Sequence, residues 1–253
     1  MISPQVSIIT ATFNSSKTIL DTYNSILMQD LKDWEWLVTD DCSTDETVLI
    51  LRELSNKDDR VKFFINKVNS GAAISRNNSM SASKGDFLAF IDSDDRWKKG
   101  KLVEQIKFME DNNVDFSFTP YTYINECGEA LNKIVDLDNI SSVGYEELLK
   151  KKVTLGCSTV IIRKSAFIND LSMPNIRTGQ DYAFWLKLLK QGSNARLFNS
   201  VLTEYRIMPN SISRNKLKKA KRQWEIYRSI EGLNLMKSLN CFVNYSVRAV
   251  FRK

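Results

Sequence analysis

The chain has 253 residues, 43% of them hydrophobic, which suffices for one large domain or for a domain with a small appendage. It contains no histidine, which excludes Ser–His or Cys–His nucleophile pairs and histidine metal ligands. The formal charge of +6 equals the six basic residues of Arg214–Arg222, a run without acids that indicates an acidic or phosphate-bearing partner rather than a nucleic-acid binder that is basic throughout.

The first half of the chain alternates between strand-like and helix-like stretches. Buried strands are expected at residues 6–12, 34–39, 61–65 and 87–91. Helices are expected after residues 14–16, after a capping box at Ser43 and Glu46, over 71–83 with Gly85 closing the helix, and over 98–112. One face of the first helix should carry Ile19, Leu20, Tyr23, Ile26 and Leu27, and the second helix should continue through Val48, Leu49, Leu51 and Leu54. This alternation predicts an α/β fold with a mostly parallel central sheet flanked by helices.

The second half is less regular. Strands are expected at 116–124, 158–162, 195–198 and 202–207, a helix at 180–191, and a variable insertion or loop at 126–156. From Lys216 the chain is expected to form a helical extension to its end. Apolar residues of this tail follow helical spacing with basic residues beside them, namely Leu235, Leu239, Phe242, Val243 and Val250. The tail is expected either to pack on the core or to lie on an anionic membrane face.

The four cysteines, Cys42, Cys127, Cys157 and Cys241, include no CxxC pair, so we expect reduced thiols rather than disulfides or a zinc site. The amino end lacks a basic region followed by an apolar signal core, so no secretion signal is expected. No run of about 18 apolar residues occurs, so no membrane-spanning segment is expected either.

Three carboxylates follow the apolar run Phe87–Ile91, namely Asp92, Asp94 and Asp95. Carboxylates so close together repel one another and resist burial, and a divalent cation would resolve the conflict. Oxygen ligands suit Mg²⁺ or Mn²⁺, which bind phosphate oxygens. The stretch therefore indicates a metal–diphosphate site at the carboxyl end of a strand, and a solvated acidic turn is the alternative. Residues 12–14 and 40–41 also follow predicted strands, so all three segments should face one rim.

Five motifs occur in order along residues 4–215: SIITATFN, VTDDCSTDET, NSGAAISRNNSMSASKGDFLAFIDSDD, TGQDYAFWLKLLKQG and YRIMPNSIS. Together they resemble the inverting family 2 glycosyltransferases, whose nucleotide-sugar-binding fold is termed GT-A. The most similar members build O-antigen, capsule or teichuronic-type polysaccharides in bacteria. The resemblance implies a GT-A domain over 1–215, divided into a nucleotide-binding half (1–112) and an acceptor half (113–215), followed by a basic amphipathic helical tail over 216–253.

The resemblance also implies an activity. A hexose or N-acetylhexosamine would pass from a UDP-sugar to a saccharide acceptor linked to polyprenyl diphosphate, with Mn²⁺ or Mg²⁺ as cofactor. The enzyme would be cytoplasmic and peripheral on the inner face of the plasma membrane, with anionic lipid and no nucleic acid among its partners.

The resemblance assigns the donor site residue by residue. Thr12, Phe13 and Asn14 would line the nucleotide pocket, although an ordinary capped turn is the alternative. Asp41 would accept the uracil N3–H, or else cap the following helix. Arg76 would reach the base, ribose or diphosphate, or else form an ion pair.

The metal motif Asp92-Ser93-Asp94 follows the same pattern. The resemblance places Asp94 on the metal and Asp92 on the ribose or the metal, while Asp95 would face the donor sugar or hold the loop. Arg206, with Ser211 or Ser213, would close over the diphosphate, or else form a structural pair. Met208 stands where relatives often have a histidine, which puts a third protein ligand in doubt.

Asp181 matches the family's general base, which takes the proton from the acceptor hydroxyl as that oxygen attacks the anomeric carbon. Gln180 stands where a glutamate is common. The alternative for Asp181 is an acid favoured by the helix dipole at a helix N-terminus.

Two other functions were weighed. In an aspartyl phosphotransferase or phosphatase, Thr or Val is expected two residues after the second Asp of the Asp-x-Asp loop, where this chain has Arg96. A non-enzymatic basic adaptor for membrane or nucleic acid would leave Asp41, Asp92, Asp94 and Asp181 unexplained.

Overall fold

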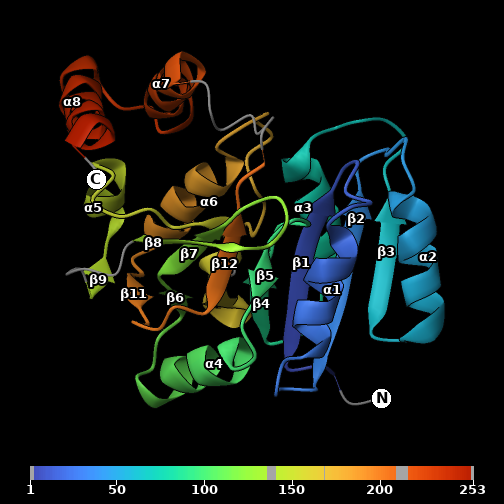
Figure 1. The fold of residues 1–253 in the computed structure, drawn as a ribbon. Helices are drawn as coiled ribbons and strands as arrows, with labels where there is room; N and C mark the ends of the chain where they lie inside the picture. Colours follow the sequence, from blue (N-terminus) through green and yellow to red (C-terminus); the bar gives the residue numbers. More distant parts are fainter. Residues whose placement is uncertain (1–2, 136–140, 168, 209–215, 252–253) are drawn as a thin grey trace.

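An eight-stranded sheet forms the centre of the computed structural model, which describes residues 3–135, 141–167, 169–208 and 216–251 (Figure 1). In spatial order the strands are β3 (Val61–Ile65), β2 (Trp34–Asp40), β1 (Val6–Thr12), β4 (Phe87–Phe90), β10 (Ile161–Arg163), β6 (Phe116–Phe118), β11 (Ala195–Leu197) and β9 (Ser142–Val143). The first four are mutually parallel, whereas β10 and β9 run against their neighbours. The predicted α/β class with a mostly parallel sheet is confirmed.

Helices cover both faces of this sheet. One core cluster joins the strands to α1 (Ile19–Leu27), α2 (Thr47–Lys57) and α4 (Lys101–Asp111), and the other joins them to α3 (Ala72–Ser81), α5 (Tyr145–Leu149) and α6 (Gln180–Leu189). Successive side chains of β1 point to opposite faces of the sheet, so Ile8 belongs to the first cluster and Ile9 to the second. The sheet is thus buried on both sides, and functional groups collect at its carboxyl rim.

A second, four-stranded sheet flanks this rim. It contains β5 (Arg96–Trp97), β12 (Thr203–Arg206), β7 (Tyr121–Ile124) and β8 (Ala130–Val135). The single strand predicted over 116–124 is therefore wrong: β6 and β7 belong to different sheets. Pro120 lies between them and has no N–H to donate to a ladder, which explains the break. The expected loop over 126–156 holds β8, β9 and α5 in its described part.

The predicted helix starts need correction at α2. Ser43 and Glu46 form no capping box, because Ser43 donates both its N–H and its hydroxyl to the Asp40 carboxylate. Instead, Asp45 accepts the N–H of Thr47, the first residue of α2, at 3.0 Å. A local turn bond has replaced the expected cap.

Two other residues that were expected to begin or end a helix have different roles. Asn14 has a φ of 50° and accepts the N–H of Thr44, so it joins two loops and does not cap α1. Gly85 does not end α3, which stops at Ser81. A Cβ at Gly85 would lie 2.5 Å from the Ser7 nitrogen, so glycine permits close strand approach there. Leu20 and Leu27, which were expected on the apolar face of the first helix, flank the buried stripe and are exposed, as is Leu49 on α2.

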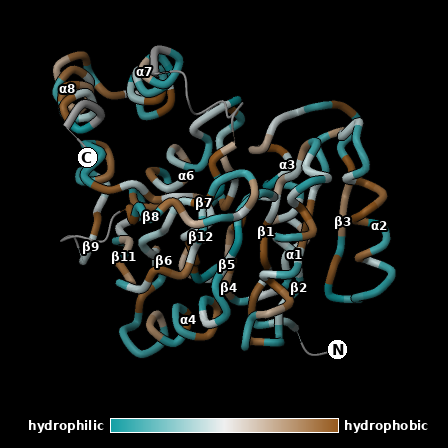
Figure 2. Tube along the Cα trace, in the orientation of Figure 1, coloured by the Kyte–Doolittle hydropathy of each residue, from teal (hydrophilic) through white to brown (hydrophobic). Residues whose placement is uncertain are grey.

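The helical tail is confirmed, with a break. It consists of α7 (Lys216–Glu225), a π-helical turn (Ile226–Ile230) and α8 (Leu235–Phe251). Ile226, Tyr227 and Cys241 join the core cluster that contains α6, so one face packs on the domain. Figure 2 shows hydrophobic and hydrophilic residues mixed along α8. The opposite face of this helix leaves five apolar side chains exposed, namely Leu235, Met236, Leu239, Val243 and Val247. Within the described residues, every helix is too short or too polar to cross a bilayer. All four cysteines are free, as expected.

Candidate active site

The ends of β1 and β2 are joined at the carboxyl rim. Thr12 pairs with Asp40 in the parallel register, and the Asp41 N–H donates to the Thr12 carbonyl at 2.8 Å. The Asn14 N–H donates to the Ser43 hydroxyl at 2.8 Å. Thr12 is buried, and its hydroxyl has no partner among the described residues, whereas Phe13 is 47% exposed. Two of the predicted nucleotide-binding segments therefore lie side by side.

Asp41 is buried and fixed by the loop that precedes α3. Its Oδ1 accepts from Asn66 Nδ2 at 2.8 Å and from the Ser70 N–H at 2.7 Å, and its Oδ2 accepts from the Gly71 N–H at 2.7 Å. Gly71 is the N-cap of α3 and has a φ of 91°, a conformation that glycine adopts without strain. The carboxylate thus orders the 66–71 loop and, at its Oδ2, keeps room for a further donor.

Arg76 projects from α3 and pairs with Asp92. Its Nη2 donates to Asp92 Oδ1 at 2.5 Å, and the arginine side chain is 6% exposed. Its Nε and Nη1 atoms are buried without a hydrogen-bond partner among the described residues. Burial opposes its charge, but the neighbouring Cys157, Asp92 and Asp181 outweigh burial and raise the pKa of Arg76. Two nitrogens of this buried cation therefore lack the acceptor that buried donors normally have.

Asp92, Asp94 and Asp95 follow β4 and cluster as the sequence predicted. One carboxylate oxygen of each lies within 4.8 Å of the others. Burial, and then the charge of Asp92, raise the pKa of Asp94 to about 6. Ionisation of the cluster is therefore unfavourable in the metal-free protein, and a bound cation would offset this repulsion.

Asp95 is fully buried and holds the loop rather than facing the rim. Its Oδ2 accepts from the Ser158 hydroxyl at 2.5 Å, and its Oδ1 accepts from the Arg206 backbone N–H at 2.8 Å. Ser158 also accepts the Asp92 N–H at 3.0 Å. Burial, followed by the charges of Asp94 and Asp92, raises the pKa of Asp95 well above its usual range. Of the two roles expected for Asp95, these contacts match the support of the loop.

Ser93 ties the acidic loop to the segment before α1. Its hydroxyl lies 2.8 Å from that of Ser15, and its carbonyl accepts from the Thr18 hydroxyl at 2.9 Å. These contacts align the acidic loop with the turn that carries Phe13.

Arg206 lies beneath the acidic loop, in a place that differs from the prediction that it closes over a diphosphate. Its Nε donates to the Asp94 carbonyl at 2.7 Å, its Nη1 to the Glu126 carbonyl at 2.9 Å and its Nη2 to Asp21 at 3.0 Å. The guanidinium is buried, and each of its three nitrogens donates to an acceptor within the protein. Ser211 and Ser213, its expected companions, lie outside the described residues.

Asp181 lies in the first turn of α6, after Gly179 with its φ of 72°. No described residue donates a hydrogen bond to its carboxylate, and α6 has no side-chain cap. Its place in the first turn of α6 also fits the alternative of an acid favoured by the helix dipole. The charge of Asp181 acts on Arg76, Cys157 and Tyr205, and the charge of Asp92 acts on the same three groups, so Asp181 and the acidic loop influence a shared set of side chains.

The loop before α6 also reaches the nucleotide side of the rim. Arg177 Nη1 donates to Asn69 Oδ1 at 2.8 Å, and Asn69 Nδ2 donates to the Asp41 carbonyl at 3.1 Å. Asp41 and Asp92–Asp95 follow strands of one parallel set, as predicted, and the loop that leads to Asp181 contacts this rim through Arg177 and Asn69.

The acidic loop fits a divalent cation of the oxygen-binding class. Asp94 is its least compensated carboxylate, and Asp92 keeps its Oδ2 beside the Arg76 pair. Asp95 has both oxygens engaged within the protein. Met208 supplies no oxygen ligand, so the protein offers two carboxylates, which suits an ion that completes its shell with phosphate oxygens and water.

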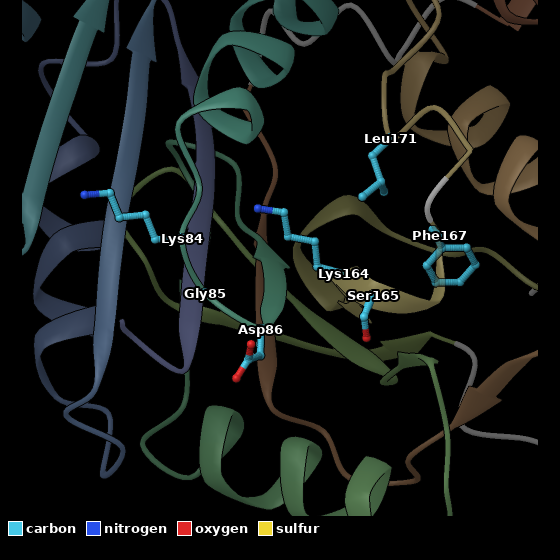
Figure 3. Close-up of a pocket in the computed structure, with 7 residues that line it drawn as sticks. All are labelled: Lys84, Gly85, Asp86, Lys164, Ser165, Phe167 and Leu171. Carbon is cyan, nitrogen blue, oxygen red and sulfur yellow. The ribbon is translucent and has the colours of Figure 1, made fainter. Parts of the chain in front are cut away.

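A separate hollow lies at the other end of β4. Its volume is about 490 Å³, and its lining residues, labelled in Figure 3, are Lys84, Gly85, Asp86, Lys164, Ser165, Phe167 and Leu171. Asp86 precedes β4 whereas Asp92 follows it, so this hollow is remote from the acidic loop along the strand.

Several residues of the site were not found from the sequence. Ser158 was expected to begin a strand, and Cys157 directly precedes it. Together with Thr159 they instead form a 3₁₀ turn (Cys157–Thr159) beside the acidic loop. Asn66 and Arg177 lie in loops without a motif. Only the position of Asn66 directly after a predicted strand, at the same rim, was a usable signal.

Comparisons with known proteins agree with this geometry. The family model described as "Glycosyl transferase family 2" matches residues 7–170. The chain is 43% identical to a putative teichuronic acid biosynthesis glycosyltransferase, TuaG, of Bacillus subtilis (strain 168), over 99% of this chain and 98% of that protein. It is 38% identical to WfgD of Escherichia coli, a UDP-Glc:alpha-D-GlcNAc-diphosphoundecaprenol beta-1,3-glucosyltransferase, over 87% of this chain and 84% of the relative.

Solved structures share the fold. S. aureus TarS 1–349 in complex with UDP-GlcNAc superposes with a TM-score of 0.73 at 23% identity, over 88% of this chain and 64% of TarS 1–349. The mannosyltransferase PcManGT from Pyrobaculum calidifontis, in complex with GDP-Man and Mn²⁺, gives 0.70 at 14% identity, over 99% of this chain and 76% of that protein. The expected GT-A fold is confirmed.

Proposed function

The chain belongs to glycosyl transferase family 2, an inverting family, and from this premise we propose that it transfers a hexose or N-acetylhexosamine from a UDP-sugar to a lipid-linked saccharide. One observation carries the proposal. Asp181, a carboxylate without a described hydrogen-bond donor, acts with its charge on Arg76, which pairs with Asp92, and on Tyr205, on which the charge of Asp94 also acts. A base and a diphosphate site would thereby be neighbours, as a single displacement at the anomeric carbon requires.

The nucleotide would lie across the ends of β1 and β2. Thr12 has an unpaired buried hydroxyl, and the exposed Phe13 ring offers a surface beside it. Asp41 would accept the uracil N3–H at its Oδ2, and Asn14 would keep the two turns in register. The fixed carboxylate would favour a pyrimidine, because the acceptor is already oriented when the base arrives.

Arg76 would donate its free Nε and Nη1 groups to the ribose or the diphosphate. Asp94 and Asp92 would hold Mn²⁺ or Mg²⁺, with Ser93 fixing their loop. When bound, the ion neutralises negative charge on the leaving diphosphate. Arg206 and Asp95 would keep the Asp94 carbonyl and the β12 end in place beneath it.

Asp181 would remove the proton from the acceptor hydroxyl. The oxygen of that hydroxyl forms a bond to the anomeric carbon as the bond from this carbon to the UDP oxygen breaks, on the opposite face of the sugar. The proton ends on the Asp181 carboxylate, and the electron pair leaves with UDP. Such a positioned base contributes about 10²–10⁴-fold to the rate.

The acceptor side of the proposal rests on WfgD, whose name states an undecaprenol-linked acceptor. An acceptor with a polyprenyl chain resides in a membrane, so the enzyme would work at the inner face of the plasma membrane. The α7–α8 tail suits this location, since exposed apolar residues of α8 lie beside a basic helix. Arg222 Nε donates to Thr178 at 3.1 Å, so α7 touches the loop that leads to Asp181.

The phosphatase alternative is not favoured, because the match to glycosyl transferase family 2 spans the acidic loop. The experiment for the proposal is a screen of UDP-sugars with Mn²⁺ and a synthetic N-acetylglucosaminyl diphospholipid. The expected result is one preferred donor and a product of inverted anomeric configuration by NMR. Retained configuration, or UDP-sugar consumption that ignores the acceptor, would contradict it.

A further inference from the structure

Three tyrosines form a contiguous cluster on the second sheet, namely Tyr121 and Tyr123 of β7 and Tyr205 of β12. Their ring centroids are 5.5 Å apart for Tyr121 and Tyr123, 5.7 Å for Tyr121 and Tyr205, and 5.8 Å for Tyr123 and Tyr205. The parallel register aligns Tyr123 with Tyr205, so the rings share one face of the sheet. Neither the acidic loop nor the proposed nucleotide pocket uses them.

This face points toward the 3₁₀ turn of the active site. Thr203, two residues before Tyr205 and on the same face of β12, donates its hydroxyl to the Ser158 carbonyl at 3.1 Å. At Gly156, two residues before Ser158, a Cβ would lie 3.6 Å from the Tyr121 ring. Tyr205 is also followed directly by Arg206, whose N–H holds Asp95. The three rings therefore lie against the support of the acidic loop.

The cluster is neither a closed core nor a free surface. Tyr121 is 6% exposed and forms the floor, whereas Tyr123 and Tyr205 are half-buried. The Tyr123 plane is inclined by 85° to both other rings, so the rings meet at a corner. Burial, and then the charges of Asp95, Asp92, Asp94 and Asp181, raise the pKa of Tyr205. Its hydroxyl thus stays protonated, under the charge of the same acids that would bind the metal and activate the acceptor.

We propose that Tyr123 and Tyr205 form the platform on which the acceptor pyranose ring stacks while its hydroxyl reaches Asp181. A pyranose presents an apolar C–H face, which an aromatic corner removes from water, and hydroxyl edges that remain free for polar contacts. The proposed nucleotide site is built from β1, β2 and α3, whereas the tyrosines belong to β7 and β12. Donor and acceptor would therefore lie on different sides of the acidic loop.

The inference rests on the proposed transfer and is tested with the full chain, a UDP-sugar, Mn²⁺ and an N-acetylglucosaminyl diphosphate carrying a short alkyl chain. Tyr205→Ala and Tyr123→Ala should each raise the acceptor KM about tenfold, with the donor KM changed less than about twofold. Tyr205→Phe keeps the ring and should restore the acceptor KM to within about threefold of the parent.

A matched control is Phe108→Ala. Phe108 stacks on Phe198 at 5.2 Å, is also half-buried, and lies on α4 away from the rim. It should lower the melting temperature as the tyrosine variants do and leave the acceptor KM unchanged. The proposal is overturned if the tyrosine variants lower kcat with an unchanged acceptor KM, or if Tyr205→Phe is as damaging as Tyr205→Ala.

Binding without turnover separates this inference from the proposed function. Saturation-transfer NMR on the same alkyl acceptor, with UDP and Mn²⁺ present, should show contact to the pyranose ring protons that Tyr205→Ala and Tyr123→Ala weaken and Phe108→Ala leaves intact. This result would support the platform even if no UDP-sugar were consumed. Equal contact in all variants would overturn it, whatever the transferase activity.

Discussion

Arg76 Nη2 lies 2.5 Å from Asp92 Oδ1, in a pair whose arginine is 6% exposed and whose aspartate is 28% exposed. The pair joins α3, at the nucleotide side of the rim, to the acidic loop after β4. It also leaves Asp94 as the carboxylate with the least compensation, because Asp95 is engaged by Ser158 and Arg206. The three acids thus differ: Asp92 is paired with Arg76, Asp95 supports the loop, and Asp94 remains for a cation.

Replacing Arg76 with methionine should destabilise the metal-free protein by about 2–3 kcal/mol, because Asp92 would be left beside Asp94 and Asp95 without its cation. Urea unfolding in EDTA measures this change. The control is Arg163→Met, since Arg163 pairs with Asp115 at the more exposed end of β10, where a change below about 1 kcal/mol is expected. Equal effects of the two substitutions would contradict the buried role of Arg76.

Asp94→Asn should stabilise the metal-free fold at pH 8 by on the order of 1–2 kcal/mol. The pKa of Asp94 is raised to about 6, above its unfolded value, so its protonated form stabilises the fold at low pH and this contribution is lost as pH rises through about 6. The asparagine mimics the protonated form and should give no advantage below about pH 4. Thermal melts in EDTA across this range test the sign. An asparagine variant less stable than the parent at pH 8 would contradict the assignment.

The same Asp94→Asn protein should lose Mn²⁺-dependent protection by UDP in a thermal melt. The proposed ion would have lost its main ligand, since an amide oxygen binds a hard cation less strongly than a carboxylate. Undiminished protection would place the ion elsewhere.

Arg206→Lys distinguishes two roles for Arg206: structural support of the acidic loop, and direct binding of the diphosphate. Lysine keeps the charge but cannot reproduce the fork that reaches the Asp94 and Glu126 carbonyls and Asp21. The melting temperature should fall together with UDP affinity. If Arg206 instead bound the diphosphate, UDP affinity would fall while the melting temperature of the ligand-free protein stayed constant.

The exposed face of α8 should bind anionic vesicles. Sedimentation with vesicles rich in phosphatidylglycerol is expected to recover the protein at low salt and to release it as salt is raised. Leu239→Gln combined with Val243→Gln should weaken recovery, because both side chains lie on the exposed stripe. Leu20→Gln combined with Leu49→Gln removes exposed apolar groups on α1 and α2 and should not. Absence of binding by the parent protein would remove the membrane proposal.

Local patterns predicted those strands and helices whose apolar residues follow the repeat of the element itself. β1 and β3 have their predicted bounds, and Leu102, Ile106 and Met109 are buried on α4 as the helical spacing required. The failures have two kinds of cause. The break at Pro120 depends on a second sheet that no local run reveals. Ser43 instead bonds to Asp40, three residues earlier, so one local turn has displaced another.

The candidate site shows the same division. The acids that follow strands were found because parallel strands bring their carboxyl ends together. The support of those acids was not, since Ser158 and Arg206 lie far along the chain from Asp95 and meet it only in the folded protein. The Arg206 side chain could not be assigned from sequence because a diphosphate and a backbone carbonyl are both acceptors of its donors.

The central claim is that Asp181 activates the acceptor at a rim where other acids and Arg76 hold the donor. Asp181→Asn measures it most directly, because asparagine preserves shape at a carboxylate that no described residue hydrogen-bonds. Titration with UDP and Mn²⁺ should give a parent-like dissociation constant, while kcat for sugar transfer falls by about 10²–10⁴-fold. Parent-like turnover by Asp181→Asn would contradict the account.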